Sequence, residues 1–269
     1  MTDRYAVIGN PIAHSKSPQI HALLAEQAGQ DMRYEAMLAP SDGFGQTVRD
    51  FIAQGGRGMN VTVPFKFDAF NIATELTERA RAAQAVNTLK FDNGAILGDN
   101  TDGAGLVRDI RENLGFHLND HRVLLMGAGG AAYGVVLPLL AAGANLTVAN
   151  RTLAKAQQLA VAFAGQGNIT ASGYEDLRGQ QFDAVINATS SSLSDEMPPL
   201  PDDIFSADAL AYDMMYGRET PFMVFAREHG AAIVADGLGM LVEQAAESFF
   251  LWRGVRPETA PVIAALRDR

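Results

Sequence analysis

Short apolar runs of strand length alternate with alanine-rich stretches of helical length along almost the whole chain. We expect strands at residues 5–8, 33–38, 58–61, 88–91, 122–126, 145–149, 184–187, 209–213 and 231–235. We expect helices at residues 17–28, 42–54, 75–82, 101–114, 131–142, 152–163, 221–229 and 238–254. This alternation is typical of α/β units, in which helices cover a mostly parallel sheet.

Composition excludes several kinds of protein. The 269 residues include no cysteine, so disulfides, thiolate metal sites and thiol nucleophiles are ruled out. The formal net charge of −10 repels the negatively charged phosphate backbone of a nucleic acid. No segment approaches the roughly 18 apolar residues of a membrane span, and the five histidines show no metal-ligand spacing. We therefore expect a cytoplasmic protein with no metal, nucleic acid or membrane partner.

The chain divides into two expected domains. A polar segment at residues 114–122 separates a helix from a new strand, so a second βαβ unit starts there. We assign residues 1–101 to the first domain and residues 102–237 to the second. The last long helix carries an apolar stripe that must be buried. Chain order suggests that residues 238–269 return to the first domain and complete it.

A glycine-rich turn lies between a strand and a helix. The strand at residues 122–126 runs directly into Gly127-Ala-Gly129-Gly130-Ala-Ala132, and a helix follows. Gly127 permits the tight turn, Gly129 lets a pyrophosphate approach the backbone, and the helix start directs free N–H groups at the anion. This context predicts a Rossmann dinucleotide-binding domain.

The next strand indicates which dinucleotide is bound. An NAD site usually has an acid after this strand, to bind the ribose hydroxyl, whereas this chain has Asn150-Arg151-Thr152 with Lys155 one turn later. Arg151 and Lys155 can pair with the 2′-phosphate of NADP. For either cation taken alone, a solvated side chain at a helix start is the default interpretation. Two cations at this position, in a chain of net negative charge, favour NADP.

Three polar clusters in the first domain stand at element boundaries, where α/β proteins display binding groups. They are residues 9–18, 60–66 and 98–103. In the first cluster, Ser15 and Ser17 offer hydroxyl donors suited to a carboxylate. A helix N-cap at Ser17, followed by Pro18, is the alternative interpretation, and the two roles can coexist.

Lys66 is one of only four lysines among 21 cationic residues. A partly desolvated lysine can release a proton, whereas arginine cannot, and reduction of a carbonyl needs a proton donor. The alternative is that Lys66 ends a proline-broken loop with its amine in water. Asp102, together with Asp99, is similarly either part of a site or a favourable charge at a helix start. The spacing leaves both interpretations open.

The polar clusters, taken with later motifs, resemble the shikimate dehydrogenase family over nearly the whole chain. The matching segments are residues 9–21, 60–66, 85–88, 98–103, 127–131, 150–152, 187–190, 213–216, 220–221 and 236–246. The resemblance implies a substrate domain beside a Rossmann domain. It also implies reversible reduction of 3-dehydroshikimate to shikimate by NADPH, in aromatic amino-acid biosynthesis.

The resemblance further implies roles for individual residues. Lys66 and Asp102 match the catalytic pair. The substrate carboxylate is assigned to Ser15, Ser17 and Tyr216, and the ring and its hydroxyls to Thr62, Asn87 and Gln244. The cofactor is assigned to Gly127, Ala128, Gly129, Gly130, Ala131, Asn150, Arg151, Thr152, Lys155, Thr189, Met214 and Gly237.

Two positions depart from the family pattern, and two other functions stay open. Ala22 replaces the more usual Asn, and Lys155 replaces a common Arg, which keeps the charge but loses the planar fork. One alternative is a quinate/shikimate dehydrogenase that uses both NAD and NADP. Another is a module that senses shikimate and NADP without turnover. We expect a monomer or a homodimer.

Overall fold

The computed structural model describes residues 2–189 and 196–267, so Ser190, which ends one of the motifs, lies outside them. The chain forms two compact units. Unit 1 is Met1–Gly105 with Val242–Arg269, and unit 2 is Leu106–Leu241. The boundaries expected from the sequence come a few residues earlier, because helices α5 (Asp102–Arg108) and α9 (Leu238–Arg253) run through the actual boundaries.

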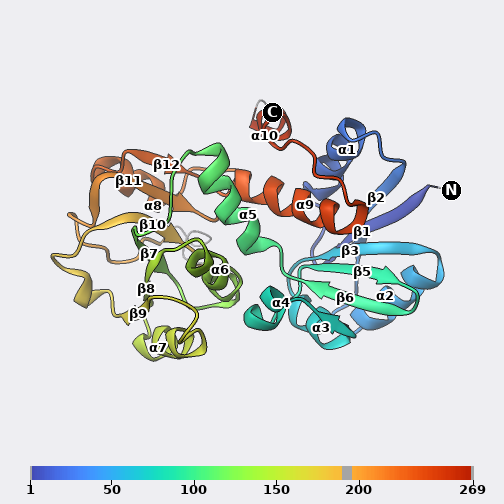
Figure 1. Ribbon diagram of the computed structural model, residues 1–269, viewed down its shortest axis with the longest axis horizontal. Coiled ribbons are helices and arrows are strands. Elements are labelled where there is room, and N and C mark those ends of the chain that lie inside the picture. Colours follow the sequence, from blue (N-terminus) through green and yellow to red (C-terminus); the bar gives the residue numbers. More distant parts are fainter. Residues whose placement is uncertain (1, 190–195, 268–269) are drawn as a thin grey trace. The chain divides into compact units, whose positions relative to one another are not determined.

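Unit 1 contains a six-stranded sheet in the order β2-β1-β3-β5-β6-β4 (Figure 1). Its strands are β1 (Asp3–Gly9), β2 (Met32–Leu38), β3 (Gly56–Val61), β4 (Glu75–Leu76), β5 (Thr88–Asp92) and β6 (Ala95–Asp99). Strand β1 is parallel to β2 and β3, and β4 is parallel to β6, whereas β5 is antiparallel to β3 and β6. In the register, Thr88 lies opposite both Asn60 and Asp99, and Ile8, directly before the first cluster, lies opposite Val61. The three polar clusters therefore meet at one edge of this sheet.

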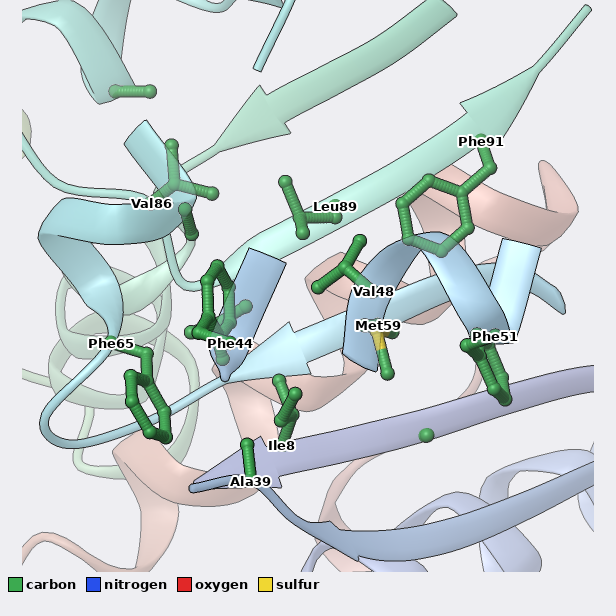
Figure 2. Close-up of a cluster of buried hydrophobic side chains, with 14 residues drawn as sticks. Ile8, Ala39, Phe44, Val48, Phe51, Met59, Phe65, Val86, Leu89 and Phe91 are labelled. Atoms are coloured by element: carbon green, nitrogen blue, oxygen red, sulfur yellow. The ribbon is translucent and has the colours of Figure 1, made fainter. Parts of the chain in front are cut away.

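The helices of unit 1 are α1 (Ser17–Gln27), α2 (Phe44–Ala53), α3 (Lys66–Ile72), α4 (Glu78–Ala83), the carboxyl-terminal part of α9, and α10 (Ala260–Arg267). Figure 2 shows the core that forms on one face of the sheet. Phe44, Val48 and Phe51 of α2 pack there with Ile8 and Met59 from the central strands. Burying side chains of this size contributes about 1.5–3 kcal/mol each.

Aromatic side chains hold α1 and α9 on the opposite face of the sheet. Tyr5 of β1 stacks on Trp252 of α9 at 4.7 Å between ring centroids, and His21 of α1 stacks on Tyr34 of β2 at 4.1 Å. Trp252 also donates from Nε1 to the carbonyl oxygen of Leu89 at 3.0 Å. Thus the last long helix of the chain packs against the earliest strands.

The expectation of an N-cap at Ser17 is wrong. Helix α1 begins at Ser17, its N-cap residue is Lys16, and no side chain of that residue caps it. The Oγ of Ser15 instead accepts from the backbone N–H of Ser17 at 3.3 Å. The chain turns earlier than expected, since the N–H of Ser15 bonds the carbonyl of Ile12 at 3.0 Å.

Three further expectations for unit 1 need correction. Strand β6 was missed, although Asn93 and Gly94, both with positive φ, form the two-residue turn typical of a hairpin before it. The helix expected at 75–82 is instead β4 followed by α4, which begins after an N-cap at Thr77. Helices α3 and α10 were also missed, since each is short.

His21 is completely buried in unit 1, and burial lowers its pKa from 6.5 to about 3, partly opposed by its hydrogen bond to Asn60. Its Nε2 lies 3.1 Å from Oδ1 of Asn60, and its Nδ1 has no partner among the described residues. An Oδ1 atom can only accept, so Nε2 carries the proton of a neutral ring. The folded protein therefore holds this histidine uncharged.

We expect His21 to destabilise the fold in acid. Below its ordinary pKa of 6.5 the unfolded chain binds a proton that the folded chain excludes until about pH 3. Stability therefore falls as the pH drops through this window, by about 1.4 kcal/mol per pH unit from this group. Urea unfolding between these limits should show a shallower pH slope for His21→Gln than for the wild type. Equal slopes would show that His21 titrates normally in the folded state.

Unit 2 contains a six-stranded sheet in the order β12-β11-β10-β7-β8-β9, with every pairing parallel (Figure 1). Its strands are β7 (Arg122–Met126), β8 (Asn145–Ala149), β9 (Ile169–Ser172), β10 (Phe182–Asn187), β11 (Phe205–Asp213) and β12 (Ile233–Ala235). Numbered along the chain, this is the strand order of a Rossmann fold. Its order reverses between β7 and β10, where such folds bind their ligand.

The helices of unit 2 are α6 (Gly130–Ala141), α7 (Leu153–Ala162) and α8 (Pro221–Glu228), with a short 3₁₀ helix at Glu175–Leu177. The helix expected at 101–114 ends as α5 at Arg108 and continues as a wider π turn, Asp109–Asn113. Strand β9 was not expected. Within the described part of the chain, no helix is both long and apolar enough to cross a membrane.

Candidate functional site

Lys66 and Asp102 form an ion pair in unit 1. Nζ of Lys66 lies 2.6 Å from Oδ2 of Asp102, with side chains 31% and 17% exposed. The alternative interpretation was that Lys66 ends a loop with its amine in water. Lys66 is instead the first residue of α3, and its amine is paired with Asp102. Asp102 is in the first turn of α5, so the charge at a helix start and the partnership with Lys66 coexist.

The second oxygen of Asp102 is also held. Its Oδ1 accepts from Nδ2 of Asn87 at 2.8 Å, and its backbone N–H donates to Oδ1 of Asn100 at 3.2 Å. A carboxylate whose two oxygens each receive a donor has little freedom to rotate. Asp102 therefore presents Oδ2 to Lys66 in a fixed direction.

Asn87 joins residues from different elements. It is buried, and its Nδ2 also lies 2.9 Å from Oγ1 of Thr101 and 3.4 Å from Oε1 of Gln244 on α9. Its Oδ1 accepts from the backbone N–H of Thr101 at 2.8 Å. The structure thus brings together four residues proposed from the sequence: Lys66, Asn87, Asp102 and Gln244.

Behind Asn87 lies a buried polar group that sequence reasoning missed. Asn60 donates from Nδ2 to Oγ of Ser248 at 2.9 Å and to Oγ1 of Thr88 at 3.1 Å, and these two hydroxyls lie 2.8 Å apart. Asn60 begins and Thr88 ends a segment that resembles the family, and each lies at or next to the end of a strand, which is a usable signal. Ser248 stands one turn after Gln244 on α9, so only the shared helix face could have indicated it.

Asp99 anchors the segment that leads to Asp102. Its carboxylate is 1% exposed. It accepts hydrogen bonds from Nε and Nη2 of Arg79, at 2.7 and 2.6 Å, and from Oγ1 of Thr77 at 2.6 Å. Burial alone would lower the pKa of Arg79, but Asp99 and Glu247 raise it overall. Asp99 is therefore a buried anchor and not a solvated charge.

The hydroxyl residues of unit 1 follow parallel strands at the same edge of the sheet. Ser15 and Ser17 come after β1, and Thr62 comes directly after β3. Oγ of Ser15 uses a lone pair on the N–H of Ser17, so its own O–H can donate elsewhere. Burial raises the pKa of Tyr34 well above its usual value, and a side-chain hydrogen bond with Ser17 opposes the rise.

The glycine-rich turn of unit 2 has an open surface. Gly127 adopts φ +105°, which favours glycine, and its N–H bonds the carbonyl of Ala149 at 2.8 Å. A Cβ on Gly129 or Gly130 would meet nothing within 4 Å. Helix α6 begins here without a side-chain cap, and Ala131 in its first turn is exposed, so its first N–H groups suit a pyrophosphate.

The residues after β8 present cations to solvent. Arg151, Thr152 and Lys155 are exposed, while Nδ2 of Asn150 bonds the carbonyl of Thr152 at 3.0 Å. Neither cation forms an ion pair within residues 2–189 and 196–267. Burial raises the pKa of Tyr174 to about 12, and the nearby charge of Arg151 opposes the rise. Arg151 thus lies close to a buried aromatic ring.

Three proposed cofactor residues lie where neighbouring parallel strands end. Thr189 follows β10, Met214 follows β11 and Gly237 follows β12. A Cβ on Gly237 would lie 2.3 Å from the carbonyl oxygen of Met214, so only glycine permits this approach. Tyr216 is half-buried, which raises its pKa. It belongs to unit 2, whereas the other proposed substrate residues belong to unit 1.

Among the described residues, no three histidine, cysteine, aspartate or glutamate side chains form a group that could hold a metal ion. A parallel Rossmann sheet with a glycine-rich turn, together with a separate α/β unit carrying a lysine–aspartate pair, is the architecture of a two-domain dehydrogenase that uses a nicotinamide dinucleotide.

Comparison with known families specifies which family of dehydrogenases the chain belongs to. Residues 7–89 match the shikimate dehydrogenase substrate binding domain, residues 109–194 match shikimate / quinate 5-dehydrogenase, and residues 237–267 match the shikimate 5′-dehydrogenase C-terminal domain. The chain belongs to the shikimate dehydrogenase family.

Individual relatives match almost end to end. The shikimate dehydrogenase (NADP(+)) of Nitrosospira multiformis is 65% identical over 270 residues, which cover 100% of this chain and 98% of that protein. The crystal structure of an Ael1 enzyme from Pseudomonas putida is 52% identical with a TM-score of 0.95, covering 98% of each chain. Shikimate 5-dehydrogenase from Thermus thermophilus, solved with NADP(H) and shikimate, is 32% identical with a TM-score of 0.88, covering 99% of each chain.

Proposed function

We propose that this protein catalyses the reversible, NADPH-dependent reduction of 3-dehydroshikimate to shikimate in aromatic amino-acid biosynthesis. Two of the relatives named above carry the name of this activity, and one of them is 65% identical over the full chain. The observation that carries the proposal is the Lys66–Asp102 pair, with 2.6 Å between Nζ and Oδ2, at the polar edge of unit 1.

The residues of unit 2 fit NADP. When bound, the reduced cofactor supplies the hydride that the substrate carbonyl carbon receives. The open turn from Gly127 through Ala128 to Ala131 offers backbone donors to a pyrophosphate. Arg151 and Lys155 offer charge to the 2′-phosphate, with Asn150 and Thr152 beside them. Thr189, Met214 and Gly237 form the nicotinamide end.

Lys66 is proposed as the proton donor. As the carbonyl carbon is reduced, negative charge develops on its oxygen, and the ammonium both stabilises that charge and gives it a proton from Nζ. Asp102 keeps Nζ in place. Lys66 is 31% exposed, so water can restore its proton. In the direction of oxidation, the neutral amine takes the proton from the hydroxyl.

The substrate groups are assigned by their chemistry. The hydroxyls of Ser15, Ser17 and Tyr216 are donors for a carboxylate. Thr62, Asn87 and Gln244 combine donors and acceptors, which suits the hydroxyls of a ring. The amide of Asn87 is already oriented by Asp102 and Thr101. Ring hydroxyls thus meet a preformed surface.

We expect the purified protein to reduce NADP⁺ when shikimate is added, seen as a rise in the absorbance of reduced nicotinamide. Losing the 2′-phosphate contacts removes charged hydrogen bonds worth about 1.5–3 kcal/mol, so kcat/KM with NAD⁺ should be about 10- to 100-fold lower. Quinate belongs in the same assay, because residues 109–194 match a family described as shikimate / quinate 5-dehydrogenase.

Each outcome of this assay selects one function. Comparable rates with quinate and NAD⁺ would favour the quinate/shikimate enzyme of broader cofactor use. Shikimate and NADP binding without turnover would favour the sensing module. The monomeric or homodimeric state and the cytoplasmic location stay predictions, which sedimentation and cell fractionation can test.

A further inference from the structure

Asp213 is a fully buried carboxylate at the end of β11, with 0% of its surface exposed. It accepts hydrogen bonds from Oγ1 of Thr220 at 2.6 Å, from the backbone N–H of Met215 at 2.9 Å, and from Nδ2 of Asn187 at 3.1 Å. All of these partners lie at the carboxyl ends of β10 and β11 or just beyond. The carboxylate therefore lies behind the proposed nicotinamide end of the cofactor site.

The charge of Asp213 sets the orientation of Asn187. A carboxylate can only accept, so the amide group that faces it must be the NH₂. The amide oxygen of Asn187 then faces the other way, where it accepts from both Oγ1 and the backbone N–H of Thr189, at 2.7 and 3.1 Å. The hydroxyl of Thr189 therefore gives its proton to Asn187, and the orientation of Asn187 fixes that of Thr189.

A second route runs through the backbone. The N–H of Met215 is held by Asp213, and the carbonyl of Met215 accepts from the N–H of Gly237 at 2.8 Å. The N–H of Met214 donates to the carbonyl of Asn187 at 3.0 Å. Thr189, Met214 and Gly237 are thus each linked to the Asp213 carboxylate through a single intermediate residue.

We propose that Asp213 is a positioning residue for hydride transfer. Asp213 and Asn187 are 0% and 1% exposed, so they act through the residues that they orient and not by contact with ligand. The inference rests on the proposed function and deepens it. Asp213 determines where the nicotinamide end is held, while the adenosine end, near Arg151 after β8, depends on other contacts.

The experiment compares the wild type with Asp213→Asn. The substitution keeps the shape of the side chain. The new amide must direct its NH₂ group at either the NH₂ of Asn187 or the N–H of Met215, so none of its orientations satisfies both of these donors. Misplacement by about 1 Å can cost 10²-fold in rate, and we expect kcat to fall by about 10- to 100-fold. Binding of adenosine 2′,5′-bisphosphate, which lacks nicotinamide, should stay within about twofold of the wild type, since its contacts are unaltered.

Exchanging the two residues is the rescue. In Asp213→Asn combined with Asn187→Asp, the NH₂ at position 213 faces a carboxylate that still accepts from Thr189. The amide introduced at position 213 still offers an oxygen to the N–H of Met215. We expect the double variant to recover at least half of the lost kcat on a logarithmic scale. Thr220→Val removes a single donor and should give a smaller loss with the same pattern.

Asp183→Asn is the matched control on the opposite end of β10. Its carboxylate accepts from the N–H of Arg122 at 2.8 Å and Oγ of Ser206 at 2.7 Å, far along the strand from Asn187. This variant should keep kcat. Thermal melting checks that each variant is folded.

Two results would overturn the inference: unchanged kcat in folded Asp213→Asn, or equal losses of kcat and of bisphosphate affinity, which mark a structural role only. If Asp213→Asn does not fold, an unchanged kcat in Thr220→Val would overturn the inference. Absence of turnover in the wild type refutes the proposed function instead, so the two failures are distinguishable.

Discussion

Replacing Lys66 with alanine should lower kcat by about 10²- to 10⁴-fold, which is the usual contribution of a positioned general acid. Shikimate binding should largely remain, because the proposed carboxylate donors and ring contacts belong to other residues. Lys66→Arg should lose nearly as much, since arginine keeps the charge but cannot release its proton. The pair of variants therefore separates proton transfer from electrostatic attraction.

Steady-state rates and shikimate dissociation constants, measured on both variants, check this prediction. Lys90 on β5 provides a matched control, since it is another lysine of unit 1, and Lys90→Ala should keep the wild-type rate. A near-normal kcat for Lys66→Ala would mean that another group supplies the proton. High activity in Lys66→Arg would mean that charge alone is enough.

Replacing Arg151 with alanine should raise KM for NADPH by about 10- to 100-fold, since the variant loses charged hydrogen bonds to the 2′-phosphate worth about 1.5–3 kcal/mol. Activity with NADH should change little, because NADH has no phosphate at that position. The ratio of kcat/KM for the two cofactors is the quantity to measure. Lys155→Ala should shift this ratio less, because an ammonium lacks the bidentate fork.

Arg178 supplies the control for this series. It is an exposed arginine of the same unit, close to the Glu175–Leu177 turn, and Arg178→Ala should leave the cofactor ratio unchanged. Equal losses with NADPH and NADH in Arg151→Ala would show that Arg151 supports the fold or binds adenosine, and that NADP preference has another source.

Local patterns predicted a large part of this molecule. The strand, glycine turn and helix around Gly127 are contiguous in sequence, so their geometry can be read from neighbours. Lys66 and Asp102 were paired through a family resemblance, because they stand 36 positions apart and no spacing rule links them. The parallel sheet of unit 2 likewise follows from alternating strands and helices.

Buried polar contacts could not be predicted in this way. Asn60 and Ser248 are 188 residues apart, and Asn187 and Asp213 are 26 apart, so only the folded chain shows that they are partners. Asp99 looked like a helix-start charge until Arg79 was seen to hold it. Short elements failed for another reason, since two residues in β4 are too few for a periodic pattern.

The placement of α9 has a consequence for the order in which the growing polypeptide folds. Trp252 stacks on Tyr5 and donates a hydrogen bond to Leu89, and Ser248 accepts one from Asn60. The strands that are synthesised first therefore lack these partners until a helix near the end of the chain has been synthesised. Domains generally fold as units during synthesis. Unit 2 can therefore fold before unit 1, whereas unit 1, which contains the Lys66–Asp102 pair, is completed only as translation ends.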